Sequence, residues 1–587
     1  MKRYGARGFT LPTVVIVSVL MFGALALAVQ MVAVSSSSLK GIYVTQLARE
    51  AAESGARRAE SCLRENSMSV TWTEAKPLKP NTDCSGNVLT ELDAYLMNNG
   101  GHRALFAVNA STHAEGIQVQ VQGIVEQLNT SSGTVINTFS QSLKAEVRQE
   151  PVHATSISSG LHQVCVVLSG NTWCNGGNQY GQMGNGRVES LAEKVYLQPE
   201  RVAREEGLLR GRTDKIVVSG MQAACTVTTD SEIYCWGRSG YGYLGLGNAP
   251  SPPNPQTKPA KVLKPVGMTG EVTAIAMGWD ATCAVSGGDV WCWGRNHYGQ
   301  VGDGTTTHRY VPVRVSTIGT HAGRPVTNIA SHPYAGSFCA VAGGDAYCWG
   351  RNTYGQLGDN TTTNRYTPVA VLKQSGRLAG KTVTKVINVA ATRTQDGAID
   401  TPDGTGGSCT PSSRSCYVQS HSCALTSDGQ MYCWGSNQYG QMGQGTWSLT
   451  NQLVPIRVLG ALDGKVVRDI ASSYYTPCAL TTEADTGDRL YCWGGNQHGA
   501  GGLGHTNVCN NNSICSPTPV VMQTPGLQGR YITSINAGVN RMCALADGVS
   551  YCTGLNTHAQ LGDGTLTSRS VPTEAKVFRK YQPVFMF

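Results

Sequence analysis

The chain has 587 residues, of which 70 are glycine and only 14% are charged, a composition that favours a turn-rich β protein over a helical one. Its length exceeds that of one ordinary hydrophobic core, so more than one domain is expected. The net charge is +8, yet no basic run or arginine-rich stripe occurs, which argues against a nucleic-acid partner.

The N-terminus predicts a membrane helix behind a short basic leader. Residues 14–34 contain no charged side chain, and a helix rising about 1.5 Å per residue would carry them across roughly 30 Å, the thickness of a bilayer core. Lys2, Arg3 and Arg7 favour a cytoplasmic N-terminus. A secretory signal peptide is cleaved at small residues after its apolar run, whereas Gly8 precedes the run here.

This order of basic leader, Gly8, Phe9 and apolar run resembles the leader of type IV prepilins. The resemblance implies that a prepilin peptidase removes residues 1–8 and that Phe9 becomes a methylated N-terminus. Pilin leaders usually carry Glu at the fifth mature position, which is Thr13 here, after Pro12. This departure resembles minor subunits at a pilus tip and weakens the case for polymerisation. The alternative is a signal-anchored surface protein.

The residues that follow predict a small α+β domain. Residues 39–65 place small and apolar side chains on one helical face and charged side chains opposite, which predicts an amphipathic helix continuing the membrane span over about residues 9–65. Residues 116–148 alternate between apolar and polar side chains around a Thr-Ser-Ser-Gly turn, the pattern of a β-hairpin. A helix followed by such a hairpin resembles the pilin head, so residues 9–150 are expected to form a pilin-like domain.

The rest of the chain repeats one motif seven times: a cysteine in an apolar stretch, a short turn, Cys-Trp-Gly or a variant, and a Gly-rich turn. Second cysteines of successive units lie 56 to 61 residues apart except for one interval of 85, and such a period indicates a propeller or a solenoid. The repeat pairs are Cys165 with Cys174, Cys225 with Cys235, Cys283 with Cys292, Cys339 with Cys348, Cys423 with Cys433, Cys478 with Cys492, and Cys543 with Cys552.

The remaining cysteines also have a partner nearby in the chain. By spacing they are Cys62 with Cys84, Cys409 with Cys416, and Cys509 with Cys515. Because no CxxC knuckle occurs, we expect all of these pairs to be disulfides, formed outside the reducing cytosol, and we expect no metal site.

Residues 156–587 resemble the regulator of chromosome condensation repeat family, which implies that residues 151–587 form a seven-bladed β-propeller. Each unit contains an inner strand, the Cys strand, the Cys-Trp-Gly strand and a Pro-led strand. If each Pro-led strand pairs with the next core, the last one joins the first core and closes the ring within one blade. The Pro-led strands contain Pro199, Pro259, Pro312, Pro368, Pro455, Pro519 and Pro572.

Three features of the repeats are candidate binding elements. The tryptophans of the Cys-Trp-Gly units form a binding stripe or, as we favour, pack between blades; they are Trp236, Trp293, Trp349, Trp434 and Trp493. The turn residues Asp303, Asp359 and Asp563 bind calcium or, more in keeping with lone turn aspartates, cap their own backbone. Residues 391–419 and the loop of Cys509 and Cys515 interrupt the pattern and either serve recognition or are neutral variation of surface loops.

No catalytic motif emerges, so we expect a non-enzymatic protein without a cofactor. The main hypothesis is a pilin-like subunit, inserted in the membrane and then displayed on the cell surface or pilus, whose propeller mediates adhesion. Its partners would be other pilins, the assembly machinery, the prepilin peptidase and a surface protein or glycan. The alternative is an anchored surface propeller that binds or inhibits a protein partner. A guanine-nucleotide exchange regulator fits less well, because that role belongs to a reduced, cytosolic ring.

Overall fold

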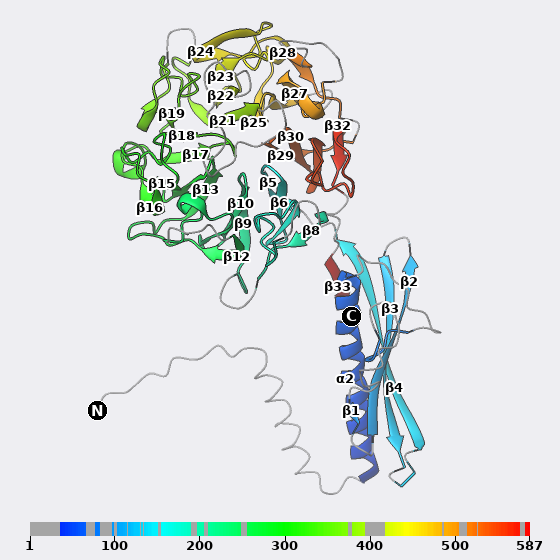
Figure 1. Ribbon diagram of the computed structural model, residues 1–587. Coiled ribbons are helices and arrows are strands. Elements are labelled where there is room, and N and C mark those ends of the chain that lie inside the picture. Colours follow the sequence, from blue (N-terminus) through cyan, green and yellow to red (C-terminus); the bar gives the residue numbers. More distant parts are fainter. Residues whose placement is uncertain are drawn as a thin grey trace, which may run out of the picture. The chain divides into compact units, whose positions relative to one another are not determined.

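A computed structural model describes two compact units, one formed by Met1–Pro151 with Lys580–Phe587 and one by Val152–Arg579 (Figure 1). The described residues are 36–65, 77–82, 97–98, 102–113, 116–129, 131–132, 134–150, 154–188, 196–204, 209–247, 255–373, 378–393, 417–483, 487–503, 514–524, 526–575 and 582–586. The leader, Gly8, Phe9, Thr13 and the apolar run at 14–34 lie outside them. Within the described residues, no helix has the length and apolar character that a bilayer crossing requires.

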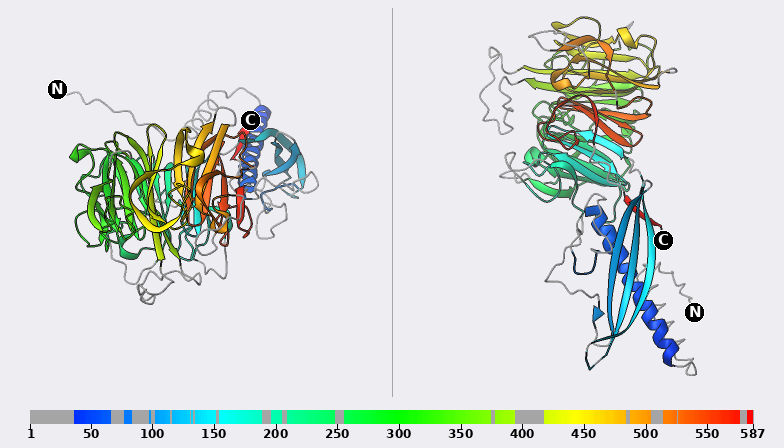
Figure 2. Two further views of the ribbon diagram at one scale, coloured as in Figure 1. Left: turned by 90° about the horizontal axis from the view of Figure 1, so that it is seen from above. Right: turned by 90° about the vertical axis from the view of Figure 1, so that its right-hand side faces the viewer.

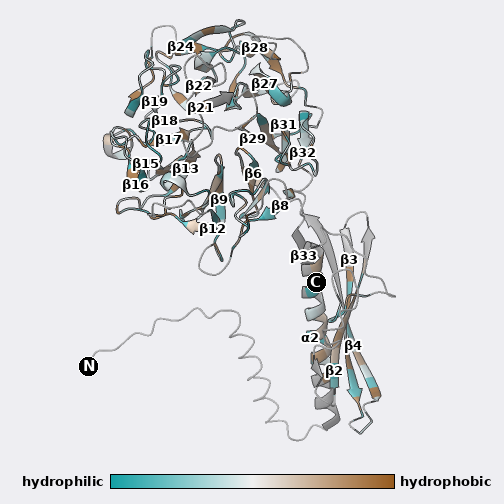
Figure 3. Cartoon of the chain, viewed as in Figure 1, coloured by the Kyte–Doolittle hydropathy of each residue, from teal (hydrophilic) through white to brown (hydrophobic). Residues whose placement is uncertain are grey.

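The first unit is one helix packed on an antiparallel sheet (Figure 2). The helix is α2 (Ser36–Glu65), and the strand order is β1-β2-β3-β4-β33. The strands are β1 (Met97–Asn98), β2 (His102–His113), β3 (Gly116–Leu128), β4 (Val135–Glu150) and β33 (Gln582–Met586). The helix expected at 39–65 and the hairpin at 116–148 are therefore present, and apolar and polar residues are interspersed along the strands (Figure 3).

The C-terminal strand corrects the expected domain boundary. The sequence places all of residues 151–587 in the propeller, but β33 pairs antiparallel with β4, with Gln582 opposite Glu150 and Met586 opposite Glu146. The open edge of β4 accounts for this pairing, because an unpaired strand edge offers a full row of backbone hydrogen-bonding groups. The propeller is thus an insertion between two neighbouring strands of the first sheet.

The helix approaches the sheet closely through small residues. Ala48 and Ala52 are fully buried on α2. A Cβ atom on Gly123 of β3 would lie 1.8 Å from the Ala48 carbonyl oxygen and 2.5 Å from the Ala52 nitrogen. Only glycine fits at this contact, because any side chain there would collide with the helix backbone.

The second unit consists of seven four-stranded antiparallel sheets, each built from four consecutive strands, which are the blades of a propeller. Blade 1 contains β5 (Ala154–Ser159), β6 (Gln163–Leu168), β7 (Asn171–Gly176) and β8 (Tyr196–Arg201). Blade 2 contains β9 (Asp214–Ser219), β10 (Ala223–Thr228), β11 (Ile233–Gly237) and β12 (Gln256–Lys261). Blade 3 contains β13 (Val272–Met277), β14 (Ala281–Ser286), β15 (Asp289–Gly294) and β16 (Arg309–Arg314). Blades 4 and 5 contain β17 (Val326–Ala330), β18 (Ser337–Ala342), β19 (Asp345–Gly350), β20 (Arg365–Ala370); β21 (Val383–Arg393), β22 (Tyr417–Thr426), β23 (Met431–Asn437) and β24 (Ser448–Arg457). Blades 6 and 7 contain β25 (Val467–Ser472), β26 (Pro477–Glu483), β27 (Gly487–Gly495), β28 (Cys515–Val521); β29 (Ile532–Gly538), β30 (Arg541–Ala546), β31 (Val549–Gly554) and β32 (Arg569–Glu574). Short 3-10 turns are η1 (Gly240–Gly242), η2 (Thr320–Ala322), η3 (Gly460–Leu462) and η4 (Gln497–Gly499).

The expected closure of the ring through a shared blade is wrong. Each Pro-led strand is the fourth strand of its own blade and not part of the next one. The turn after the third strand brings the chain straight back onto that strand, so that in blade 3 Val313 lies opposite Cys292 and Arg309 opposite Gly294. Proline suits this outermost position, where its missing N–H leaves no ladder bond unmade.

Blades 1 and 7 meet instead through a backbone hydrogen bond from the Ala154 N–H to the Gly548 carbonyl at 2.9 Å and through side chains. The Ser159 N–H donates to the Asn536 side chain at 2.9 Å. The buried guanidinium of Arg541 donates to the Ser159 hydroxyl at 2.9 Å and to the Leu161 carbonyl at 3.0 Å, and it also reaches the Gly160 carbonyl. The side chain of Arg541 therefore spans the junction between the first and last blades.

Seven disulfides join the second and third strands, one in each blade, with Cα atoms 4.1 Å apart. The two cysteines of each bridge lie directly opposite each other in the ladder. All seven repeat pairs expected from the sequence are confirmed: Cys165 with Cys174, Cys225 with Cys235, Cys283 with Cys292, Cys339 with Cys348, Cys423 with Cys433, Cys478 with Cys492, and Cys543 with Cys552.

The other three expected pairs are described only in part. Cys62 and Cys515 are disulfide-bonded. Their expected partners, Cys84 and Cys509, lie outside the described residues. Both members of the third pair, Cys409 and Cys416, also lie outside them, so these three pairings stay predictions.

Removing one of the blade disulfides is expected to destabilise the ring moderately. Replacing both Cys283 and Cys292 with alanine frees a loop of separation 9, which should lower the free energy of unfolding by about 2–3 kcal/mol. Chemical denaturation of the full chain measures this loss. The difference from wild type should vanish in a reductant that opens all the bridges, and a difference that persists there would contradict the disulfide as its cause.

Candidate functional site

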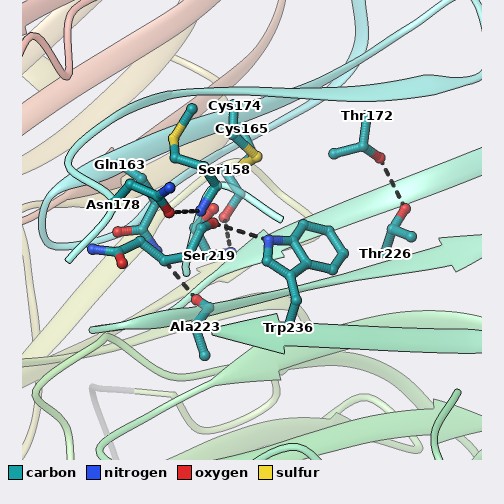
Figure 4. Close-up of a disulfide and its surroundings, with 12 residues drawn as sticks. Ser158, Gln163, Cys165, Thr172, Cys174, Asn178, Ser219, Ala223, Thr226 and Trp236 are labelled. Carbon is teal, nitrogen blue, oxygen red and sulfur yellow. Dashed lines mark hydrogen bonds between the residues drawn. A yellow bond between two sulfur atoms is a disulfide. The ribbon is translucent and has the colours of Figure 1, made fainter. Parts of the chain in front are cut away.

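The repeated tryptophans are internal packing residues and not a binding stripe. All five are fully buried, and each indole N–H donates to a backbone carbonyl of the preceding blade at 2.8–3.0 Å. Trp236 lies in one apolar cluster with the first blade's disulfide, Cys165–Cys174 (Figure 4). This confirms the interpretation that the tryptophans pack between blades.

The turn aspartates are engaged by protein donors. The Asp303 carboxylate accepts from the Asn296 amide at 3.2 Å, from the Thr305 hydroxyl at 2.7 Å and from Arg309 at 2.6 Å. Burial by itself would raise the pKa of Asp303, but the bonds from Thr305 and Arg309 outweigh it and lower the pKa. The same network surrounds Asp359 and Asp563. No group of three or more metal-ligating side chains occurs among the described residues.

The turn network predicts that stability is independent of calcium. A chelator should leave the thermal midpoint unchanged. Asp303→Ala should lower the free energy of unfolding by about 1–3 kcal/mol, because it leaves several partly buried donors without an acceptor. Differential scanning calorimetry measures both effects. A fall in the midpoint on chelation that calcium reverses would contradict this assignment.

The central cavity is a small polar channel. The inner strands of the blades surround about 180 Å³, less than the roughly 300–1,000 Å³ of typical ligand pockets. Its polar side chains already bind neighbouring blades: the Ser158 hydroxyl accepts from the Ser219 N–H at 2.8 Å, and Asn328 accepts from the Val386 N–H at 3.0 Å. Both of these side chains therefore hold neighbouring blades together.

The buried His421 and the partly buried His162 predict acid sensitivity of the ring. Burial lowers the pKa of His421 to about 3, and burial together with His558 and Arg541 lowers the pKa of His162 to about 3. Unfolded histidines bind a proton below about pH 6.5, so stability should fall as the pH drops from there towards 3, by about 1.4 kcal/mol per unit for each histidine. Denaturation midpoints between about pH 7.5 and 5 measure this slope. His421→Gln should make the slope shallower, and an unchanged slope would contradict the assignment.

One end of the ring combines two irregular features, and we call it the ribbon face. In an antiparallel blade the connections from strand one to two and from strand three to four lie at the same end. In blade 5 the first of these is enlarged: β21 and β22 pair as a ribbon out to Arg393 opposite Tyr417. The two ends of the expected insertion, residues 391–393 and 417–419, therefore lie at this end, and residues 394–416 lie outside the described residues.

Arginines and aromatic rings alternate across blades 1 to 4 at this same end. Arg238 lies over the Tyr180 ring with its guanidinium carbon 5.9 Å from the ring centroid. Arg295 lies between Trp279 at 4.4 Å and Tyr241 at 5.0 Å. We call this set the arginine–aromatic row; it comprises Tyr180, Arg238, Tyr241, Trp279, Arg295, Tyr298 and Arg351.

Two histidines border the row and are poorly suited to bind a metal. The rings of His297 and His308 lie 4.6 Å apart. The Nδ1 atom of His297 accepts from Arg295, and that of His308 accepts from the Asn296 N–H, each at 3.0 Å. A neutral ring with Nδ1 accepting carries its proton on Nε2, which is then a hydrogen-bond donor and not a ligand.

Sequence reasoning missed the row, although a signal exists. Arginine follows Cys-Trp-Gly at positions 238, 295 and 351, whereas Gly177, Ser436, Gly495 and Leu555 occupy the same position in the other blades. The motif alone does not show that each arginine stacks on a ring of the preceding blade, because the two residues lie more than fifty positions apart in the chain.

Comparisons with known proteins agree with this architecture. Residues 230–285, 287–334 and 343–394, and separately 272–300 and 415–441, match the regulator of chromosome condensation (RCC1) repeat. The chain is 27% identical over 431 residues to the ultraviolet-B receptor UVR8 of Arabidopsis thaliana, covering 73% of this chain and 82% of the receptor. It is 27% identical over 406 residues to the human E3 ubiquitin-protein ligase HERC2, covering 69% of this chain but only 7% of the ligase.

Solved structures show the same fold. Prp20p of Saccharomyces cerevisiae superposes with a TM-score of 0.53 at 18% identity, covering 73% of this chain and 87% of that one. Human WBSCR16 gives 0.52 at 20% identity, covering 69% and 89%. The ring therefore has the β-propeller fold of these structures, and part of its sequence matches the RCC1 repeat.

Proposed function

We propose that this protein is a non-catalytic binding protein whose propeller engages a protein partner through its ribbon face. The observation that carries the proposal is the β21–β22 ribbon: among the described residues, the first two strands of blade 5 are longer than those of any other blade. Long connections on a rigid scaffold are common sites of recognition. A protein with a similar fold, yeast RCC1 (Prp20), has been solved in complex with another protein, Kap60.

A ribbon-shortened variant tests the proposal. Val389 and His421 lie directly opposite each other in the ribbon, so an Asn-Gly turn can replace residues 390–420 with a two-residue hairpin. Cross-linking on intact cells followed by mass spectrometry should recover a partner with the wild-type chain and lose it with this variant. A control replaces only residues 394–416 and keeps the paired strands. Identical partners for all three chains would refute the proposal.

We further propose that the first unit displays the ring at the cell surface, as a pilin-like subunit would. The packing of a long helix on an antiparallel sheet through Ala48, Ala52 and Gly123 favours this role, together with the Gly8–Phe9 leader in the sequence. On this proposal the protein is inserted in the membrane before it reaches the surface. Mass spectrometry of the mature chain should find methylated Phe9 at the N-terminus, and an N-terminus elsewhere would refute the pilin-like role.

A further inference from the structure

The arginine–aromatic row has cations that the ring itself leaves without carboxylate partners. Within the described part of the chain, neither Arg238 nor Arg351 forms an ion pair. Arg238 bonds the Gln222 side chain at 2.9 Å, and Arg351 bonds Thr353 at 3.1 Å. A guanidinium has five N–H donors, so most of the donors of both groups stay available.

Other arginines of the same repeats differ sharply. Arg309, Arg365 and Arg569 each bind the turn aspartate of their own blade at 2.6–2.7 Å. An arginine that stabilises a turn of its own blade is therefore paired with a carboxylate of that turn. Arg238 and Arg351 of the row do not follow this rule, whereas Arg295 lies 3.6 Å from the carboxylate of Asp280.

The packing of the ring does not require the row either. At the position of its three arginines the remaining blades have Gly177, Ser436, Gly495 and Leu555, and those blades have the same four-stranded structure. Arginines that occur at this position in three adjacent blades and are dispensable in the other four point to a ligand and not to the scaffold.

The row is continuous and positively charged. The positive charges of Arg238 and Arg295 both stabilise the negative charge of the buried Asp280, whose carboxylate lies 3.6 Å from Arg295. Trp279 lies between Arg295 and Tyr298, and the Tyr298 ring is in turn covered by Arg351 at 5.2 Å. Asp280 is 3% exposed, so it offers solvent little negative charge. The exposed His297 adds an Nε2 donor at the border.

We infer that the arginine–aromatic row binds an acidic segment of a polypeptide, with the planar guanidinium groups of Arg238 and Arg351 accepting carboxylates and the rings between them covering the intervening apolar side chains. The row contains arginine and no lysine, and arginine's fork matches a carboxylate in two-point contacts. Arg295, whose side chain is 14% exposed, acts mainly by positioning the rings. The inference rests on the proposed function and names the chemistry of the partner.

The test measures binding of a fluorescein-labelled decapeptide of Glu and Asp to the full chain by fluorescence anisotropy. Binding should saturate at about 50 mM NaCl and weaken at about 300 mM, because the site is partly exposed to screening. A decapeptide of Gln and Asn should not bind. The variant R238G/R351S, which introduces residues that other blades carry at this position, should bind at least about tenfold more weakly, a loss of about 1.4 kcal/mol.

Two further variants separate geometry from charge. R238K/R351K keeps the charge but loses the planar fork, so its affinity should fall between those of wild type and R238G/R351S. R314S/R457S removes the same charge from half-exposed arginines at the C-terminal ends of fourth strands, at the opposite face, and should bind like wild type. If R238G/R351S does not fold, the lysine variant still decides the question.

Several outcomes would overturn the inference: no binding by the wild type, equal affinity of wild type and both row variants, or tighter binding of a sulfated oligosaccharide than of the peptide. The ribbon-shortened variant distinguishes a failure of this inference from a failure of the proposed function. If the row variants keep peptide affinity while that variant still loses its partner, only the present inference fails.

Discussion

Replacing Arg541 with methionine is expected to loosen the junction between the first and last blades and to lower the free energy of unfolding of the ring by about 3 kcal/mol. The guanidinium is fully buried and donates to the Ser159 hydroxyl and to the carbonyls of Gly160 and Leu161. Methionine fills similar space but leaves these acceptors unsatisfied. Burial lowers the pKa of Arg541 to about 9, as expected for a cation removed from water, so loss of the buried charge offsets part of the loss of the hydrogen bonds.

Two measurements test this effect. Chemical denaturation gives the free energy, and hydrogen exchange should show faster exchange in β5 than in β13, because only β5 adjoins the junction. Arg530→Met on the same blade, where the side chain is 38% exposed, should change stability by less than about 0.5 kcal/mol. An Arg541→Met ring with wild-type stability would show that the junction is held by other contacts.

Replacing Gly123 with alanine is expected to displace α2 from the sheet of the first unit. The new Cβ would overlap the Ala48 carbonyl oxygen at 1.8 Å, and backbone atoms of a helix cannot yield as a flexible side chain can. We expect a loss of about 3 kcal/mol in that unit, seen as faster hydrogen exchange throughout Ser36–Glu65.

The matched control is Gln122→Ala. Gln122 is the preceding residue of β3 and is exposed, so its side chain points away from the helix. Its exchange pattern should equal that of wild type, and the seven blades should be unaffected by either change. Wild-type protection of α2 in Gly123→Ala would mean that the helix and sheet adjust without cost.

The sequence predicts the cores of the blades well because their signal is local. Each Cys pair, such as Cys283 and Cys292, marks two adjacent strands and their register. A period does not specify where a blade begins, and for this reason the pattern assigns the Pro-led strands to the wrong neighbour. Strand β33 carries no repeated motif, so nothing in the pattern indicates its pairing with β4.

The candidate site was only partly predictable for a similar reason. The insertion in blade 5 is visible as a long interval between cysteines, and it marks the ribbon. The row depends on which residues of successive blades meet, for example Arg351 with Tyr298. That contact arises from the curvature of the ring, which single-sequence reasoning does not provide.

The return of the chain to β4 has a mechanical consequence. Because Glu150 and Gln582 face each other across one ladder, the ring is joined to the first unit by two covalent connections that leave from paired strands. A pull from a bound partner is then divided between them and loads the β4–β33 ladder. The blades next to those connections are the first and the last, so the same pull acts on the junction that Arg541 spans. Tension on this propeller is therefore expected to load two covalent connections, whereas tension on a propeller attached by a single linker would load only one.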